Sequence, residues 1–110
     1  MESVLPTSRL VTSDLVIIET LNYLSRYDPV LRREAYALLV ALRSDPTVDV
    51  IRLSDKLFND AGKLFLKYSD KSWSFIDCAS IVIMREWKIE DALTSDRHFE
   101  QAGFRALLLH

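Results

Sequence analysis

Residues 72–99 read SWSFIDCASIVIMREWKIEDALTSDRHF, and this segment carries the strongest evidence for the fold class. Apolar residues at helical spacing predict a helix over about 73–87, and a short apolar run predicts a strand over 91–94. Asp77 stands at the start of this helix, and Asp96 stands where the strand breaks into a turn. Functional side chains gather at the carboxyl ends of parallel strands in α/β sheets. Two acids that converge there would make a site for a cation and a phosphate.

The rest of the chain continues the alternation of helices and strands. Strands are expected over residues 9–12, 47–53, 91–94 and 104–109, and helices over 14–27, 29–43, 55–68, 73–87 and 95–101. Strands separated by helices predict an α/β fold, with a parallel sheet and helices packed on its faces. Since no repeat or second domain is visible, residues 1–110 are expected to form a single domain.

Composition narrows the classes of function. The chain is 49% hydrophobic, so it can form a core, and its net charge of −2 argues against binding nucleic acid by bulk electrostatics. A local basic patch or a bound cation could still hold a phosphate backbone. The absence of GxGxxG and of GKS or GKT motifs excludes the usual nucleotide-binding loops, and the absence of HExxH and CxxC argues against a zinc site. Cys78, the single cysteine, is expected to be a reduced core residue.

The location of the protein follows from two features of the sequence. No apolar run approaches the roughly 18 residues that a membrane-spanning helix needs. Residues 1–6 lack the basic and then apolar order of a signal peptide. The chain is therefore expected to be soluble and cytoplasmic, with no membrane partner.

Glu19 is the acid that is hardest to explain structurally. The helix expected over 14–27 is apolar nearly all round, so it should be buried on more than one side. Helical spacing places Glu19 on the same side as Leu15, Val16 and Tyr23. A carboxylate there needs a partner, a cation or the mouth of a cleft.

Asp77 and Asp96 each have a structural interpretation beside a functional one. Ser74-x-x-Asp77 fits a capping box, in which the acid bonds back to the residue that caps the helix. Asp96 could likewise cap the turn over 97–99. Clustered carboxylates repel one another unless a divalent cation neutralises them, and Mg²⁺ or Mn²⁺ prefers oxygen ligands. Such an ion could activate a water and hold a phosphate, so the residues alone indicate a possible metal–carboxylate site.

Three segments resemble the PIN domain, and in particular the VapC-like ribonuclease toxins of prokaryotic toxin–antitoxin pairs. They read VIIETL (residues 16–21), SFIDCAS (74–80) and LTSDRHF (93–99). The order and spacing match from about residue 9 onward, and the TxDxxF element at 94–99 is the most specific part. The resemblance implies a three-layer α/β/α fold with a mainly parallel sheet.

The same resemblance implies an activity and its residues. Glu19, Asp77 and Asp96 would bind Mg²⁺ or Mn²⁺ and hydrolyse RNA phosphodiesters through a metal-activated water. Thr94 and Arg97 become candidate RNA contacts, although Arg97 could equally be a solvated turn residue. His98 is expected to cap or pack rather than to act as a base. The implied partners are an RNA substrate and a cognate antitoxin.

The sequence departs from the family at its N-terminal end. PIN domains begin with a strand that carries an aspartate followed by serine or threonine, and nothing before residue 9 has that form. In the family this strand lies in the middle of the sheet, so its loss would remove a cation ligand and leave two rows of unpaired backbone groups. Three explanations compete. Either the start codon is miscalled or the chain truncated, or the chain is a degenerate member of the family, or another protomer or partner segment fills the gap in the sheet. We expect the N-terminal βα portion to be missing, a homo-oligomer or partner to close the open edge, and weak or absent activity in this chain alone. The alternative is a non-catalytic PIN-like binding or oligomerisation module.

Overall fold

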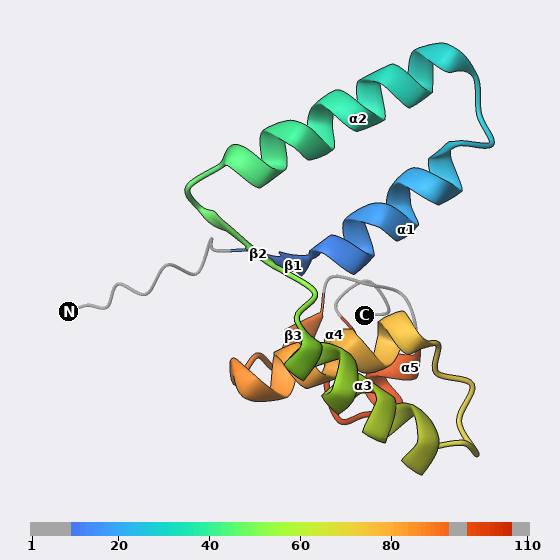
Figure 1. Ribbon diagram of the computed structural model, residues 1–110, viewed down its shortest axis with the longest axis vertical. Coiled ribbons are helices and arrows are strands. Elements are labelled where there is room, and N and C mark those ends of the chain that lie inside the picture. The colour runs from blue at the N-terminus through green and yellow to red at the C-terminus, as the bar shows by residue number, and fades with distance from the viewer. Residues whose placement is uncertain (1–9, 93–96, 107–110) are drawn as a thin grey trace. The chain divides into compact units, whose positions relative to one another are not determined.

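The computed structural model describes residues 10–92 and 97–106 (Figure 1). The chain divides into two compact units, Met1–Leu53 and Ser54–His110, and each is described by itself. The expectation that residues 1–110 form a single domain therefore stays a prediction.

The first unit is a β–α–α–β arrangement (Figure 1). Its elements are β1 (Leu10–Ser13), α1 (Asp14–Leu24), α2 (Pro29–Ser44) and β2 (Val48–Ile51). The two strands pair in parallel, with Leu10 opposite Val48 and Ser13 opposite Ile51. Helices α1 and α2 form the connection between them and run antiparallel (Figure 1). Parallel strands need such a crossover, which is why the two strands flank a pair of helices.

The helices of this unit begin where the sequence predicts. The hydroxyl of Ser13 accepts a hydrogen bond from the backbone N–H of Val16 (3.2 Å), and the carboxylate of Asp28 accepts one from Leu31 (2.8 Å). These bonds satisfy N–H groups that have no partner inside the helix. Pro29 occupies the first turn of α2, where its fixed φ favours the helix.

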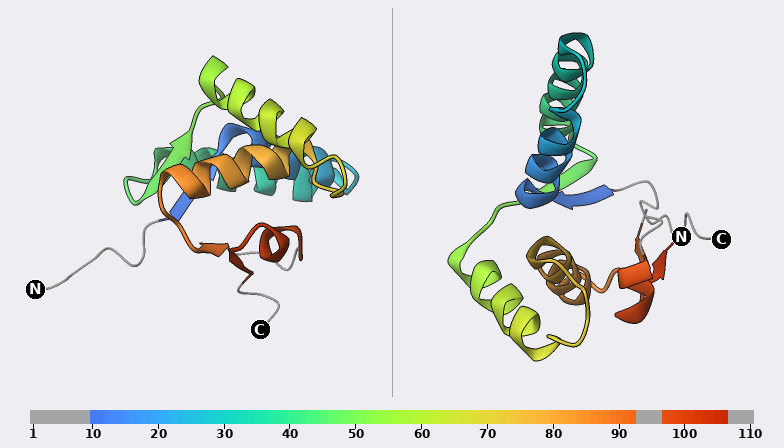
Figure 2. Two further views of the ribbon diagram at one scale, coloured as in Figure 1. Left: turned by 90° about the horizontal axis from the view of Figure 1, so that it is seen from below. Right: turned by 90° about the vertical axis from the view of Figure 1, so that its right-hand side faces the viewer.

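The second unit places two helices against each other and follows them with a short strand pair (Figure 2). Its elements are α3 (Asp55–Lys67), α4 (Phe75–Glu86), β3 (Asp91–Ala92), α5 (Arg97–Gln101) and β4 (Arg105–Ala106). Helix α4 supplies most of the core, and six of its residues are buried: Cys78, Ala79, Ile81, Val82, Ile83 and Met84. Leu57 and Ala61 are buried on α3. The prediction that Cys78 is a core residue is confirmed, since its side chain is 0% exposed and makes no disulfide.

The second strand pair is also parallel. Asp91 lies opposite Arg105, and the guanidinium of Arg105 donates two hydrogen bonds to the Asp91 carboxylate, at 2.8 and 2.9 Å. Gly103 makes the turn before β4 with φ +97°, a conformation that side chains disfavour. The predicted parallel pairing is thus found in both units. Within residues 10–92 and 97–106 the strands form two separate two-stranded sheets, one in each unit.

The end of α4 has a backbone feature that the sequence does not announce. Lys88 adopts φ +56°, the left-handed conformation that glycine usually occupies after a helix. The N–H of Ile89 donates to the carbonyl of Met84 (2.8 Å), and the N–H of Lys88 donates to that of Arg85 (3.3 Å). This pair of bonds is a Schellman motif, and it stops the helix in spite of the lysine.

Several expected boundaries and one expected burial pattern are wrong. Helix α1 ends at Leu24 rather than at residue 27, and β2 is shorter at both ends than the predicted 47–53. Only Ile17 of α1 is buried and Ile18 is 53% exposed, so α1 is not buried on more than one side in the described chain. The outer parts of the strands predicted over 91–94 and 104–109 lie outside the described residues. No helix in the described part of the chain is long and apolar enough to cross a membrane.

Candidate active site

Asp77 lies in the first turn of α4 and takes part in its cap. The hydroxyl of Ser74 accepts a hydrogen bond from the Asp77 N–H, and Oδ2 of Asp77 accepts one from the Ser74 N–H, both at 3.0 Å. The two residues therefore form the reciprocal capping box that the Ser-x-x-Asp spacing predicts. The structural interpretation of Asp77 is confirmed, and its functional interpretation has to be compatible with this cap.

His98 of α5 holds the same carboxylate from a second side. Its Nδ1 lies 2.9 Å from Oδ2 of Asp77, and its Nε2 lies 3.0 Å from the hydroxyl of Ser72. Because a carboxylate can only accept, Nδ1 carries a proton and donates to Asp77. In the neutral ring, Nε2 then accepts from Ser72. This position agrees with the expectation that His98 packs against its neighbours, and it fixes the orientation of Asp77.

Both donors use Oδ2, which leaves the other oxygen of Asp77 uncommitted. Within the described residues Oδ1 has no hydrogen-bond partner, although the side chain is only 16% exposed. No buried side-chain oxygen of these residues lacks a hydrogen bond, so Oδ1 must reach the surface. One held oxygen and one accessible oxygen make a carboxylate that suits a hard cation as a single-oxygen ligand.

The neighbouring thiol is not part of such a site. Burial, and to a smaller extent the charge of Asp77, raise the pKa of Cys78 above its ordinary value. The thiol therefore stays protonated at neutral pH, and a protonated thiol is a poor metal ligand and a poor nucleophile. Any cation at this end of α4 would be held by oxygen.

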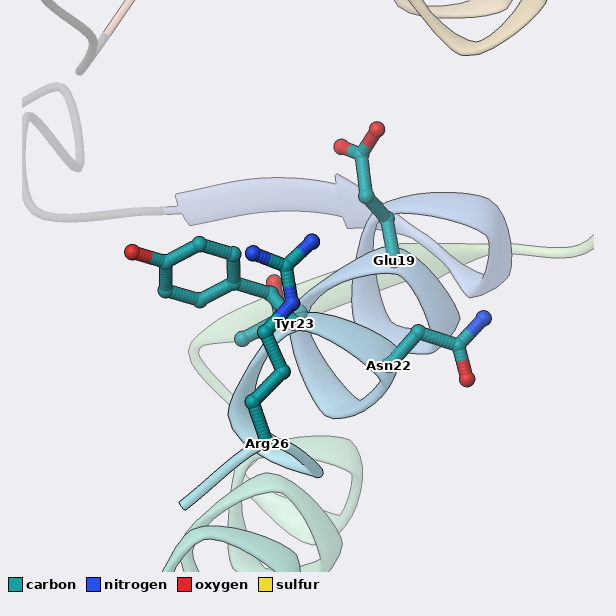
Figure 3. Close-up of a pocket in the computed structure, with 5 residues that line it drawn as sticks. Glu19, Asn22, Tyr23 and Arg26 are labelled. Atoms are coloured by element: carbon teal, nitrogen blue, oxygen red, sulfur yellow. The ribbon is translucent and has the colours of Figure 1, made fainter.

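Glu19 lies on the exposed surface of α1 and lines a shallow depression of about 530 Å³ (Figure 3). Its carboxylate makes no hydrogen bond or ion pair with the described residues. Of the three residues expected on its side of the helix, Leu15 and Val16 are half-buried and Tyr23 is 52% exposed, so this side of α1 is only partly covered. Exposure removes the need for a compensating partner, and it leaves both oxygens of Glu19 available to a ligand.

The remaining predicted residues lie at α5 and before it. Asp96 and Thr94 lie outside the described residues, and their roles stay predictions. Arg97 begins α5 with its side chain 77% exposed, and its guanidinium lies 3.8 Å from the carboxylate of Glu100, one turn along the helix. This is a loose surface pair, which leaves Arg97 accessible to a phosphate.

The described residues do not test whether the three predicted ligands come together, because Asp96 lies outside them. Glu19 belongs to the first unit and Asp77 to the second, and no group of three acid, histidine or cysteine side chains suited to a metal occurs among residues 10–92 and 97–106. The three-acid site therefore stays a prediction.

Sequence reasoning missed two features of these surfaces. The contact from His98 to Asp77 joins residues 21 positions apart, and no local pattern announces it. The depression on α1 is different, because Asn22, Tyr23 and Arg26 line it with Glu19 at helical spacing. That spacing was a usable signal.

Comparison with known proteins adds to this geometry. The PIN domain family matches residues 1–105. The 23S rRNA-specific endonuclease VapC20 of Mycobacterium tuberculosis, from strains CDC 1551 / Oshkosh and ATCC 25618 / H37Rv, is 28% identical over 95 residues, which are 86% of this chain and 70% of the relative. A crystal structure of M. tuberculosis VapC20, described as a sarcin–ricin loop cleaving toxin, has a TM-score of 0.77 and 30% identity over 87% of this chain and 72% of that chain.

These likenesses decide the family and the fold. The predicted α/β class with parallel strands, and the resemblance to VapC-like toxins over most of the chain, are confirmed. Both the sequence likeness and the structural likeness extend over more than four fifths of the chain, so they cover both units. The chain belongs to the PIN domain family.

Proposed function

We propose that this chain is a VapC-type endoribonuclease toxin, which hydrolyses RNA phosphodiester bonds and is controlled by a cognate antitoxin. The observation that carries the proposal is the likeness to VapC20 in both sequence and fold. That relative is named as an endonuclease specific for 23S rRNA. A structured RNA with the sarcin–ricin loop is therefore the first substrate to test, in the cytoplasm where such RNA is found.

Glu19, Asp77 and Asp96 are the proposed ligands of a divalent cation, Mg²⁺ or Mn²⁺. The donor set fits such an ion, since it consists of carboxylate oxygens, and the described members, Glu19 and Asp77, have oxygens without hydrogen bonds. When bound, the ion would lower the pKa of a coordinated water and offset the charge that develops on the phosphate.

The contribution of the chain itself is to hold these oxygens in place. Two N–H donors, from Ser74 and His98, fix Oδ2 of Asp77 and so fix the direction of Oδ1. Partners of this kind orient a ligand before the cation arrives. Arg97 and Thr94 are the proposed contacts to the RNA backbone near Asp96, and Arg97 is exposed enough to reach it.

A second copy of the chain is the proposed partner for the strand edges. Among the described strands, β1 pairs only with β2 and β3 pairs only with β4. An unpaired edge presents a row of backbone N–H and C=O groups that invite another strand. In a homo-oligomer, strands of two copies could pair along these edges and so satisfy the exposed backbone N–H and C=O groups.

The test is a cleavage assay on a synthetic sarcin–ricin loop RNA with Mg²⁺ or Mn²⁺. We expect the wild type to cleave, if only weakly, and the Asp77→Asn and Asp96→Asn variants, as well as the wild type in EDTA, to lose cleavage. Asp70→Asn is the matched control, because Asp70 is exposed and forms only a 3.7 Å pair with Lys71. A folded wild type that cleaves neither this RNA nor total cellular RNA with either ion would refute the proposal and favour a non-catalytic binding module.

A further inference from the structure

A stripe of polar and aromatic side chains runs along α1 away from Glu19. Asn22, Tyr23 and Arg26 lie three, four and seven residues after Glu19, which places all four on one face of the helix (Figure 3). With Thr20 they line the depression of about 530 Å³, and Arg26 stands just beyond the end of the helix. We call these five residues the α1 face.

The aromatic ring of this face is held by its neighbours but remains open to solvent. The guanidinium carbon of Arg26 lies 5.0 Å from the centroid of the Tyr23 ring, a cation–π distance. The Tyr27 ring lies 6.0 Å away at 56°, and its hydroxyl donates to that of Tyr23 at 3.4 Å. This hydrogen bond raises the pKa of Tyr27 above its ordinary value. Tyr23 is nevertheless 52% exposed, so part of the ring stays available to a ligand.

The charges of the α1 face are also uncommitted. Within the described chain, Arg26 makes no ion pair with a carboxylate, and Glu19, which lines the same depression, makes none with a cation. Arg26 can therefore receive an anion. Glu19, at the other end of the stripe, is one of the proposed cation ligands, and a substrate phosphate has to approach that cation.

We propose that the α1 face binds a nucleotide of the substrate RNA, with its base stacked on Tyr23 and its phosphate at Arg26. The inference rests on the proposed function and deepens it, because it places an RNA subsite beside Glu19. Proteins recognise unstacked RNA by stacking its bases on aromatic rings and guanidinium planes and by pairing its phosphates with basic side chains. Arg26 and Tyr23 offer both groups side by side, and Asn22 adds an amide that can bond a base edge.

A peptide is a poorer fit to the same surface. A docked peptide helix needs several apolar anchors in a groove, whereas the ring of Tyr23 is the only aromatic or aliphatic side chain among the five that line the depression. The α1 face therefore matches an RNA segment better than an antitoxin helix. Antitoxin binding through these residues becomes a distinct outcome of the test.

The experiment measures RNA affinity without cleavage. In an Asp96→Asn background, binding of a fluorescent sarcin–ricin loop RNA is followed by anisotropy for Tyr23→Ala, Tyr23→Phe and Arg26→Gln. We expect Tyr23→Ala to weaken binding roughly ten-fold, and Tyr23→Phe to restore most of the affinity because the ring is kept. Arg26→Gln should weaken binding and reduce the slope of log K against log salt by about 0.7, as for the loss of one phosphate contact.

The controls are Tyr36→Ala and Arg33→Gln, which change an exposed tyrosine and an exposed arginine of α2 outside the α1 face. Both control variants should bind the RNA with an affinity within about two-fold of that of the Asp96→Asn parent. The inference would be overturned if Tyr23→Ala and Arg26→Gln bound the RNA as tightly as the control variants do. It would also be overturned if Tyr23→Phe weakened RNA binding as much as Tyr23→Ala does. Loss of antitoxin binding with RNA binding unchanged would overturn it in favour of a peptide surface.

A cleavage assay separates this inference from the proposed function. It measures kcat and KM for the same Tyr23 and Arg26 substitutions, made in the chain that keeps Asp96. A wild type that cleaves, with KM unchanged in Tyr23→Ala, would leave the function standing and remove the subsite. A wild type that binds RNA through Tyr23 and Arg26 but does not cleave would support the subsite while the catalytic proposal fails. A rise in KM with kcat retained would support both.

Discussion

A pair of substitutions at the start of α4 can separate the cap from the cation site. Ser74→Ala removes the hydroxyl that accepts from the Asp77 N–H at 3.0 Å, and leaves the Asp77 carboxylate in place. Asp77→Asn keeps an oxygen that can accept from the Ser74 N–H, and removes the charge. One variant thus damages the helix cap and the other damages the proposed cation ligand.

Both substitutions lower the stability of the fold, but they differ in their effect on stabilisation by the metal. Loss of a serine cap costs about 1 kcal/mol, which for a chain of this size lowers Tm by roughly 5 °C. Asp77→Asn loses the favourable interaction of its charge with the helix N-terminus, about 0.3–1 kcal/mol, and weakens the hydrogen bond from His98. A cation at a hundred times its Kd stabilises the folded state by about 2.7 kcal/mol, which corresponds to a rise in Tm of roughly 10 °C.

The assay is thermal unfolding of each variant in EDTA and across a titration of Mn²⁺. In EDTA we expect Ser74→Ala to have a lower Tm than wild type, and we expect Mn²⁺ to raise the Tm of both by the same amount. Mn²⁺ should not raise the Tm of Asp77→Asn. Asp70→Asn, which changes an exposed acid in the loop between α3 and α4, should behave as wild type. A full Mn²⁺ shift in Asp77→Asn would refute the assignment of this carboxylate to the cation. Loss of the shift in Ser74→Ala would show that the cation needs the cap to hold the Asp77 carboxylate in place.

Three further predictions concern the second unit. Ile81→Ala should cost about 2–5 kcal/mol in urea denaturation, because this side chain is 0% exposed and its removal leaves a cavity; a cost below about 1 kcal/mol would contradict its place in the core. Lys88→Gly should raise Tm, since φ +56° costs a lysine roughly 1 kcal/mol, and an unchanged or lower Tm would argue against the left-handed turn. The hydrogen bonds from Arg105 lower the pKa of Asp91 from 3.8, so their stabilisation is present above pH 3.8 and is lost as the pH falls through the lower folded pKa. Wild type should therefore be more stable than Asp91→Asn at pH 7 and lose this advantage near pH 2, whereas a Tm difference that does not change with pH would exclude this origin.

The parts of the fold that could be predicted are those with a local cause. Ser13, Asp28, Ser54 and Ser74 each accept a hydrogen bond from an N–H three residues later. These residue types are the ones that cap helices, and the cap at Ser74 was predicted from the Ser-x-x-Asp spacing alone. The parallel pairing followed from the order of helices and strands, because parallel strands require a crossover. Both inferences need only short segments of chain.

The parts that could not be predicted depend on contacts made elsewhere. Helix α1 was expected to reach residue 27, because Asp28-Pro29 is the sequence signal expected to end it. It ends at Leu24 instead, where the N–H of Ser25 donates to the carbonyl of Leu21. Periodicity gives the faces of a helix but not what covers them, so the apolar circumference of α1 wrongly suggested that this helix is buried on more than one side. Lys88 shows the same limit, because its left-handed turn is imposed by the two backbone bonds that end α4.

Asp77 shows why a structural and a functional interpretation of one acid need not compete. A carboxylate has two oxygens, and here the cap and His98 both use Oδ2 while Oδ1 remains accessible. The charge is already stabilised by two N–H donors and by the helix N-terminus, so the fold of α4 does not need a cation. A cation bound at Oδ1 would therefore be a functional addition to a preformed site. It follows that EDTA should abolish activity without unfolding the chain, and the sequence signal of a capping box is no argument against catalysis.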